Sequence, residues 1–213
     1  MDHRSHVMSE LPLGMAYQWL SRLVIPRPIA LVSTISSDGR PNLAPFSFFM
    51  LGGSNPPSVA FCPTLDGRGR DKDTLRNVRQ TEEFVVNLVH REMIEGVNVT
   101  AYAFPPGEDE WAHAGFHPVD SLQVGPKRVA ESMVQLECQL HAITMHGDGP
   151  SASAYVIGEV LVCHIAPHVL DDEGLVEFAP VARLGGSAYL DLDGGKVFEL
   201  ERPKPPEPPS HDL

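Results

Sequence analysis

The stretch PRPIALVSTISSDGRPNLAPFSFFMLGGSNPPSVAFCPT, from Pro26 to Thr64, decides the fold. Residues 29–35 are an apolar, β-branched run that ends at the Ser-Ser-Asp-Gly sequence of residues 36–39. A cluster of Ser, Asp and Gly between two such runs is typical of a hairpin turn. Extended character resumes at residues 42–49, and residues 58–62 form a third short strand after an Asn-Pro-Pro break. Three strands with tight turns predict a barrel or sandwich and not a nucleotide-binding βαβ unit.

A series of short motifs runs in order through this stretch and beyond it. They are PRPIALVST at 26–34, Asp38-Gly39, NLAPFSFF at 42–49, Pro56-Pro57, KDTLRN at 72–77, EFVVN at 83–87 and ARLGG at 182–186. Each motif is weak alone, but the ordered set, which covers roughly residues 20–200, resembles the flavin reductase-like family of FMN-binding split barrels (flavoredoxin-like). The resemblance implies a mainly β fold with added helices, in which a Greek-key-like split β-barrel carries a helical flap.

Size and composition are those of one globular domain. The chain has 213 residues, of which 42% are hydrophobic and 21% are charged, and domains of about 100–200 residues are typical. We expect a flexible N-terminal arm (residues 1–12), the split-barrel domain (residues 13–201) and a Pro-rich mobile tail (residues 202–213). The formal net charge of −12 argues against nucleic acid and anionic membranes as partners, because it repels phosphate.

The three cysteines, Cys62, Cys138 and Cys163, show no CxxC spacing. An odd number without that spacing indicates reduced thiols in a cytosolic protein. The first 20 residues do not read as a secretory signal, and no apolar run approaches 18 residues. We therefore expect a cytoplasmic protein without a membrane span.

Apolar periodicity predicts helices at residues 15–23, 73–80, 91–103 and 111–114. The first should cover one end of the barrel. The second should begin with Asp73 or Thr74 as its cap. The last two are expected to form the helical flap, since they make a long excursion between strands.

The later strands have two kinds of pattern. FVVNLV at residues 84–89 is almost continuously apolar, so it should be buried on both faces, and Asn87 within it needs a hydrogen-bond partner. Residues 134–145 alternate apolar and polar side chains, which predicts one apolar and one polar face. They should pair with residues 154–165 in a hairpin, and residues 189–200 should form a turn-rich ending.

The residues around position 70 favour an anion site. Arg68, Arg70 and Lys72 lie in a glycine-containing loop that leads into a helix amino end at Asp73-Thr74. Free backbone N–H groups and the helix dipole favour an anion there. The alternative is an ordinary capped surface helix with solvated charges. The resemblance favours the first interpretation, because in the family the Lys-Asp-Thr segment lies beside the FMN phosphate.

Residues 42–49, together with Thr34 and Cys62, are the candidates for a flavin-ring platform. Pro45 cannot donate to a ladder and predicts a bulge that turns neighbouring amides toward a ligand. The alternative is a plain edge strand whose phenylalanines belong to the core, and the resemblance favours the flavin. Ser47 would then be a hydrogen-bond donor and not a nucleophile, because no GxSxG surrounds it.

Two further arginines, Arg27 and Arg183, could pair either with the phosphate or with an acidic residue. The ten histidines are scattered, and His113 and His117 lack an HExxH context, so no metal site is expected. The candidate cofactor-binding residues are therefore Arg27, Thr34, Asn42, Ala44, Pro45, Phe46, Ser47, Phe48, Cys62, Arg70, Lys72, Asp73, Thr74 and Arg183.

The resemblance implies a homodimeric oxidoreductase with FMN, or FAD as the alternative, as its cofactor. Such a protein accepts hydride from NADH or NADPH and passes electrons to flavin, an acceptor protein or another acceptor. GxGxxG does not occur, but in this family the nicotinamide stacks directly on the flavin and needs no Rossmann domain. No acid or base residue is assigned. The alternative interpretation is a flavin-binding electron carrier or a sensing or storage module without turnover.

Overall fold

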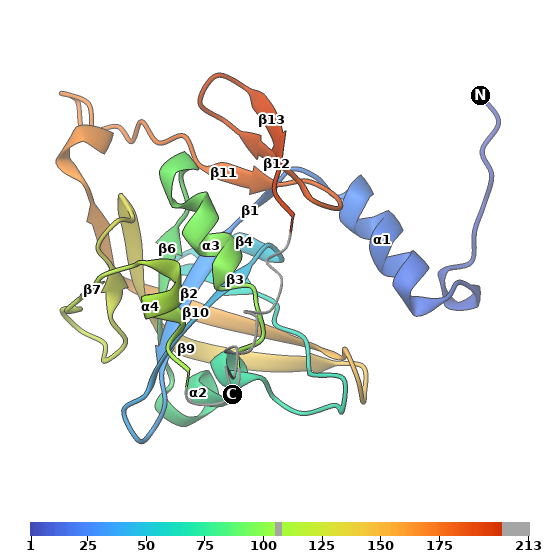
Figure 1. The fold of residues 1–213 in the computed structure, drawn as a ribbon, viewed down its shortest axis with the longest axis horizontal. Coiled ribbons are helices and arrows are strands. Elements are labelled where there is room, and N and C mark those ends of the chain that lie inside the picture. Colours follow the sequence, from blue (N-terminus) through green and yellow to red (C-terminus); the bar gives the residue numbers. More distant parts are fainter. Residues whose placement is uncertain (105–107, 202–213) are drawn as a thin grey trace, which may run out of the picture.

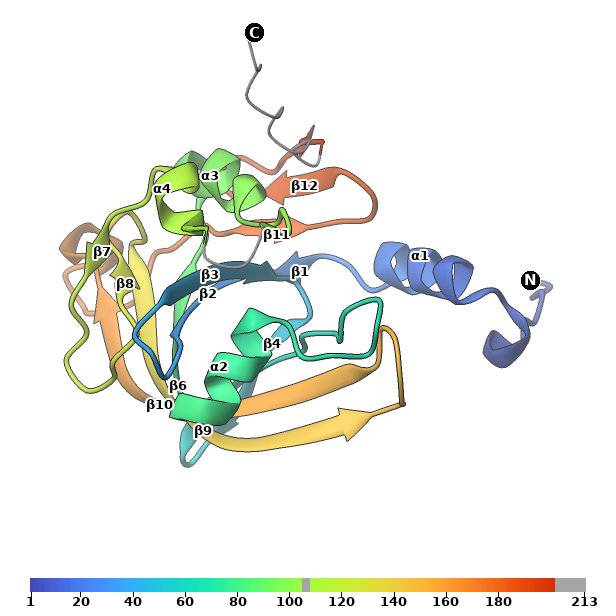
Figure 2. The same cartoon turned by 60° about the horizontal axis from the view of Figure 1, so that its bottom comes forward.

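The computed structural model describes residues 1–104 and 108–201 of the chain. A seven-stranded antiparallel sheet, in the order β3-β2-β6-β9-β10-β5-β4, curves into the barrel (Figures 1 and 2). Its strands are β2 (Ala30–Ile35), β3 (Pro41–Phe46), β4 (Phe49–Ser54), β5 (Pro57–Phe61), β6 (Glu83–Leu88), β9 (Val134–His146) and β10 (Ser153–Ile165). The predicted fold class, mainly β with added helices, is confirmed. The expected Pro-rich tail lies outside the described residues.

Two smaller sheets accompany the barrel. The order β1-β11-β12-β13 joins β1 (Arg27–Pro28), β11 (Val181–Arg183), β12 (Ala188–Asp191) and β13 (Lys196–Glu199), while β7 (Pro118–Val119) pairs with β8 (Arg128–Val129). The prediction of a turn-rich ending was wrong for residues 189–200, which contain most of the β12–β13 hairpin. The hairpin has a tertiary support that local sequence does not show, because the rings of Tyr189 and Phe198 stack with centroids 5.5 Å apart.

The helices are α1 (Leu13–Leu23), α2 (Asp73–Thr81), α3 (Ile94–Val99) and α4 (Glu110–Ala114), with short 3₁₀ turns η1 (Met8–Glu10), η2 (Arg91–Met93) and η3 (Pro167–Val169). The helix predicted over residues 91–103 ends at Val99. Val97, Val99 and Thr100 are β-branched and Gly96 has low helix propensity. Gly96 is required there, because a Cβ would lie 2.7 Å from a ring carbon of Phe116.

Helix α1 forms as predicted but does not cover the barrel. It points away from the sheets in both ribbon views (Figures 1 and 2), and Ser21 is the one residue of α1 that is buried. The prediction that this helix closes the barrel end was therefore wrong. Apolar spacing identified the helix, but spacing alone does not say what the apolar face packs against.

The core has two parts on opposite faces of β2. Ala30 and Val32 point into the barrel, where they join Phe61, Phe84 and, from α2, Leu75 and Val78 in one buried cluster. Ile29 and Leu31 belong to the second cluster, which lies under α3 and α4 and includes Trp111 and Phe116. Figure 2 shows the resulting layers, with α3 and α4 on the outer side of β2 and β3. Burial on both faces, as predicted for residues 84–89, is confirmed for Phe84–Val86 of β6.

Buried polar groups of the sheet find partners. The Asn87 side chain donates to the Leu31 carbonyl over 3.0 Å and accepts from the Val129 amide over 2.8 Å, as predicted. Glu137 belongs to the polar face that alternation predicts for β9, and it is fully buried. Its carboxylate accepts from the Leu122 and Gln123 amides and contacts His164 Nε2.

These contacts of Glu137 determine its titration. Burial opposes ionisation of the Glu137 carboxyl, but the hydrogen bonds from the two amides and from His164 outweigh burial, so its pKa is lowered. The polar face of β9 therefore anchors the loop that contains Leu122 and Gln123.

Candidate functional site

A cleft of about 900 Å³, here called the larger cleft, opens between β3, the start of α2 and the segment that follows α3. Most of the candidate cofactor residues line it: Asn42, Ala44, Pro45, Phe46, Ser47, Phe48, Cys62, Arg70, Lys72, Asp73 and Thr74. Residues from two separate regions of the sequence therefore meet at one cavity.

The amino end of α2 is the most polar part of the larger cleft. The helix begins at Asp73, with Lys72 in the cap position, and among the described residues no side chain caps it. The prediction of a cap by Asp73 or Thr74 was therefore wrong, and the first N–H groups of the helix remain open to a ligand. The dipole at this end favours an anion.

Lys72 is the available cation at this end. The Arg70 guanidinium lies 2.9 Å from Asp66, and Arg76 is paired with Asp73. Hydrogen bonds from the backbone and side chain of Arg70 and from the Arg68 amide lower the pKa of Asp66 to about 2, so this partner of Arg70 is ionised. The Lys72 ammonium is exposed and makes no ion pair within the part of the chain that the structure describes.

A buried hydrogen-bond network fixes the polar wall beside Lys72. The Asn42 amide nitrogen donates to Thr34 Oγ1 over 3.2 Å and to Thr74 Oγ1 over 3.0 Å. Asn77 Nδ2 also donates to Thr34, over 3.1 Å. The Thr74 hydroxyl thus accepts within the protein and keeps its own hydrogen for a ligand. Thr34, by contrast, lies behind the cleft and holds Asn42 and Asn77 in position.

Strand β3 forms the opposite, less polar part of the larger cleft. It lies at one edge of the sheet, and its pairing with β2 runs in continuous register from Ala30–Phe46 to Ile35–Pro41. The edge position predicted from the prolines is confirmed, but the predicted bulge at Pro45 is wrong. An edge strand has one row of backbone groups that no neighbouring strand pairs, so no bulge is needed to present such groups.

The phenylalanines of this region divide between core and cleft. Phe46 and Phe49 pack against the barrel core, as in the alternative interpretation of the sequence, and Phe46 also lines the larger cleft. Phe48 is half-exposed, lines the larger cleft and lies with its ring 6.2 Å from that of Tyr17. The Cys62 thiol also lines this cleft, and burial raises its pKa. It is a neutral wall residue there.

Two candidate arginines have structural roles. The Arg27 guanidinium is almost buried and donates to the Ser21, Val24 and Leu184 carbonyls over 2.5–3.0 Å. Burial lowers its pKa. Arg183 donates to the Gly186 carbonyl and lies over the Tyr189 ring, 4.2 Å from its centroid. Neither lines the larger cleft, and neither pairs with a carboxylate in the described residues.

Sequence reasoning missed one wall of the larger cleft. Residues 100–104, which follow α3, contribute Tyr102 and Phe104 to it. Their rings lie 4.9 Å apart, and Phe104 stacks on His113 at 4.6 Å. Two aromatic residues just before a Pro-Pro-Gly break were the available signal. The sequence analysis placed Tyr102 in a helix and Phe104 in the segment that ends it, and neither assignment indicates that the two rings line a cavity.

Glu110 of α4 was also missed. It lines the larger cleft, and within the described residues its Oε2 is buried without a hydrogen-bond partner. Burial raises the pKa of Glu110, and the negative charges of Asp73 and Asp109 act in the same direction. A carboxyl of this kind is available to a ligand.

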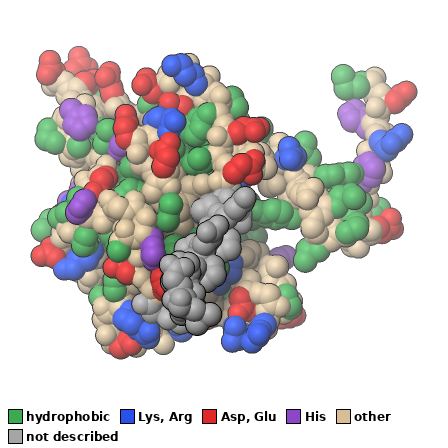
Figure 3. Space-filling view, viewed as in Figure 1, with side chains coloured by type: hydrophobic (Ala, Val, Ile, Leu, Met, Phe, Trp, Pro, Cys, Tyr) green, Lys and Arg blue, Asp and Glu red, His purple; other side chains and the backbone are tan. Residues whose placement is uncertain are grey.

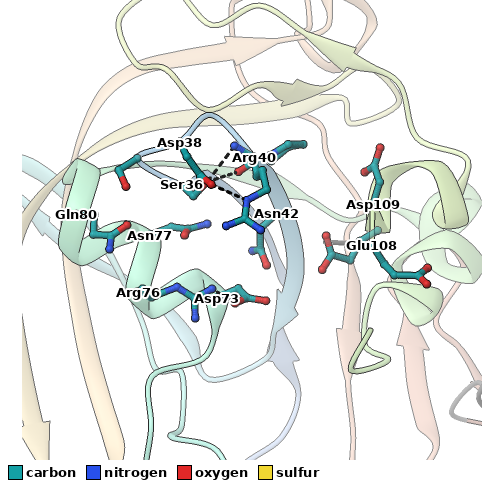
Figure 4. A pocket seen from close by; sticks show the side chains of 13 residues that line it. Ser36, Asp38, Arg40, Asn42, Asp73, Arg76, Asn77, Gln80, Glu108 and Asp109 are labelled. Carbon is teal, nitrogen blue, oxygen red and sulfur yellow. Dashed lines mark hydrogen bonds and ion pairs between the residues drawn. The ribbon is translucent and has the colours of Figure 1, made fainter. Parts of the chain in front are cut away.

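A second cavity of about 430 Å³, here called the smaller cleft, lies beside the first. Figure 4 shows Asn77 and Arg76 of α2 on one side and Glu108 and Asp109 on the other, with Asn42 between them.

Within the described residues, no group of three or more His, Cys, Asp or Glu side chains is arranged to hold a metal ion. His113 and His117 pair with separate carboxylates, those of Glu108 and Glu131.

Several known proteins are similar to this chain in sequence and in fold. A family profile described as the flavin reductase like domain matches residues 20–181. The chain belongs to the flavin reductase-like family. Protein YwrF of Bacillus subtilis is 40% identical to this member over 193 residues, which are 88% of this chain and 93% of YwrF.

Among the helices that the structure describes, none combines the length and apolar character needed to cross a membrane.

Two solved structures of the same fold are similar over nearly their whole length. Nitrilotriacetate monooxygenase component B from Bacillus cereus is 31% identical, with a TM-score of 0.86 over 94% of this chain and 100% of that chain. Pseudomonas fluorescens 2-nitrobenzoate 2-nitroreductase is 28% identical, with a TM-score of 0.80 over 98% and 100%. The split barrel of this family member is thereby established.

Proposed function

We propose that this protein is an FMN-dependent oxidoreductase that accepts hydride from NADH or NADPH and passes electrons to free flavin, an acceptor protein or another acceptor. The observation that carries the proposal is the larger cleft. At one side it has a lysine without an ion pair and a helix amino end without a side-chain cap, both as far as the described residues show, and at the other an open strand edge with aromatic walls. The similar proteins named above, a monooxygenase component and a nitroreductase, support an oxidoreductase.

The donor set of the larger cleft fits a flavin mononucleotide. Lys72 and the first N–H groups of α2 would bind the phosphate, with the Thr74 hydroxyl as a further donor. The edge of β3 offers backbone groups to the polar rim of a ring, and Ser47 adds a hydroxyl. Phe48 and the aromatic pair of residues 102 and 104 supply apolar walls. When bound, the flavin supplies the redox chemistry, because it accepts hydride from a nicotinamide and releases electrons to an acceptor.

The function is tested by an absorbance spectrum of the purified protein followed by anaerobic addition of NADH, and then of NADPH. We expect flavin bands that bleach on addition of the nicotinamide. Bound flavin that does not bleach would instead favour an electron carrier or a sensing module. A colourless protein that also fails to bind added FMN would refute the assignment of the cleft.

We also propose that the protein is a homodimer in which α1 packs on a second copy. Leu13, Leu20 and Leu23 of this projecting helix are each more than half exposed, and Figure 3 shows apolar side chains gathered over α1. A contiguous apolar surface of this kind marks an interaction site. Tyr17 of the same helix lines the larger cleft, so the proposed interface adjoins the proposed flavin site.

Sedimentation tests the dimer. The unaltered protein should sediment as a dimer, and the double substitution Leu20→Glu and Leu23→Glu should produce monomers. Gln18→Glu, which adds a negative charge at an exposed position of the same helix without removing an apolar side chain, is the control and should remain dimeric. A monomeric unaltered protein would contradict the proposal.

A further inference from the structure

The smaller cleft continues from the phosphate end of the larger one. Asp73, Arg76 and Glu110 line both clefts, as does Asn42, so the two cavities share one boundary. Helix α2 runs along both of them. Lys72 and Thr74, at its beginning, line the larger cleft alone, whereas Asn77 and Gln80, one to two turns later, line the smaller cleft alone. A ligand that extends beyond a phosphate at Lys72 would therefore enter the smaller cleft.

Two buried acceptor atoms at the smaller cleft have no partner in the described residues. Asn77 is 2% exposed and donates through Nδ2 to Thr34, but its Oδ1 accepts nothing. Glu110 Oε2 is likewise buried and unbonded. Buried polar atoms in native proteins are almost always hydrogen-bonded. Asn77 Oδ1 and Glu110 Oε2 are therefore suited to accept hydrogen bonds from a ligand that carries donor groups.

The charges around the smaller cleft indicate what kind of donor enters. Both of its cations are already paired, Arg40 with Asp38 and Arg76 with Asp73, while Glu108 and Asp109 add further negative charge to the lining. A phosphate would meet net repulsion here. A neutral group rich in hydroxyl and amino hydrogens would not, and carboxylates are common partners of ribose hydroxyls in dinucleotide sites.

We propose that the smaller cleft binds the adenosine end of a dinucleotide, whose ribose hydroxyls and amino group donate to Asn77 Oδ1 and Glu110 Oε2. This inference rests on the proposed flavin function, because it places the adenosine beyond a phosphate held at Lys72. The cavity of about 430 Å³ lies within the range of about 300–1,000 Å³ usual for small-molecule sites. Adenosine is common to FAD and to the nicotinamide dinucleotide, and the experiment separates these two sources.

The experiment blocks the smaller cleft with Gln80→Trp. Gln80 is exposed and lines only this cleft. Gln123→Trp is the matched control, since Gln123 is equally exposed and lines neither cleft. Dissociation constants for FMN and FAD are measured by flavin fluorescence, and the KM for NADH is measured on the FMN-loaded protein. An FMN dissociation constant that stays within about twofold shows that the blocked variant is folded.

FAD is the source if the unaltered protein binds FAD at least about tenfold more tightly than FMN and Gln80→Trp removes this preference. The nicotinamide dinucleotide is the source if FAD and FMN bind equally but Gln80→Trp raises the KM for NADH at least about fivefold. Either result supports the adenosine site, provided that Gln123→Trp has no such effect. A second variant, Glu110→Gln, should act in the same direction as Gln80→Trp, lowering the preference for FAD or raising the KM for NADH. Glu199→Gln, at an exposed position outside both clefts, should change neither.

The inference is overturned if Gln80→Trp leaves both the FAD-to-FMN ratio and the KM for NADH unchanged. In that case FMN binding and reduction by NADH would still stand, so the proposed function would survive. If neither flavin binds to the unaltered protein, both proposals fail together.

Discussion

Replacing Lys72 with alanine should weaken the binding of FMN while leaving the binding of riboflavin almost unchanged. The Lys72 ammonium makes no ion pair among the described residues, so its removal leaves no protein carboxylate without a partner. The loss is then that of a charge-assisted hydrogen bond to phosphate, about 1.5–3 kcal/mol. That energy corresponds to a dissociation constant about 10- to 150-fold higher. Adding Thr74→Ala removes a hydroxyl donor and should cost about 1 kcal/mol more.

The assay is a titration of flavin fluorescence with FMN and with riboflavin, which has the same ring and ribityl chain but no phosphate. Arg68→Ala is the matched control, because Arg68 lies in the same loop, is exposed and lines neither cleft. Because Arg68 lines neither cleft, it is not placed to contact the phosphate, and this control should bind FMN almost normally. Equal weakening of FMN and riboflavin by Lys72→Ala, or no weakening, would refute the phosphate assignment.

Three other predictions concern stability. Gly158→Ala places a Cβ about 2.3 Å from a ring carbon of Phe84 and should lower the free energy of unfolding, measured by urea titration, by about 1–3 kcal/mol. The control Gly14→Ala, whose Cβ meets no atom within 4 Å, should not lower it. The free energy of unfolding should fall as the pH drops below about 4.5. In that range Glu137 binds a proton in the unfolded state but stays ionised in the folded state, because its pKa is lowered there. The variant Glu137→Gln should show a flatter dependence of stability on pH in the same range. Arg27→Ala should lower the free energy of unfolding by about 1–3 kcal/mol yet leave the FMN dissociation constant unchanged; a large loss of FMN affinity in a folded variant would contradict its structural role.

The parts of the fold that could be predicted are those in which local pattern and tertiary packing agree. The apolar run of β6 is buried on both faces, and the turn at residues 36–39 joins β2 to β3. The same agreement let the ordered motifs identify the part of the larger cleft that β3 and the start of α2 line. In β6, for example, the side chains that the apolar pattern assigns to the core are the ones that the fold buries.

Prediction was wrong where a partner distant in sequence decides the outcome. Alternation placed Glu137 on the polar face of its strand, but it does not show that the loop of residues 122 and 123 covers this face and donates to the buried carboxylate. The β12–β13 hairpin depends on a ring pair rather than on a strong strand pattern. The aromatic wall at residues 102 and 104 follows the end of α3 at Val99, and α3 packs closely against Phe116 at Gly96.

The position of the proposed flavin site follows from the two-sided burial of β2. Inward residues of this strand share a core with Leu75 and Val78, which fixes α2 and so the place of Lys72. Outward residues share a core with Trp111, which fixes α4 and so the place of Glu110. On these two sides the larger cleft lies between elements that are packed against the same strand, while residues 100–104, which follow α3, form a further wall. Walls held by buried cores suit a planar ligand, because little ordering is needed there when the ligand enters.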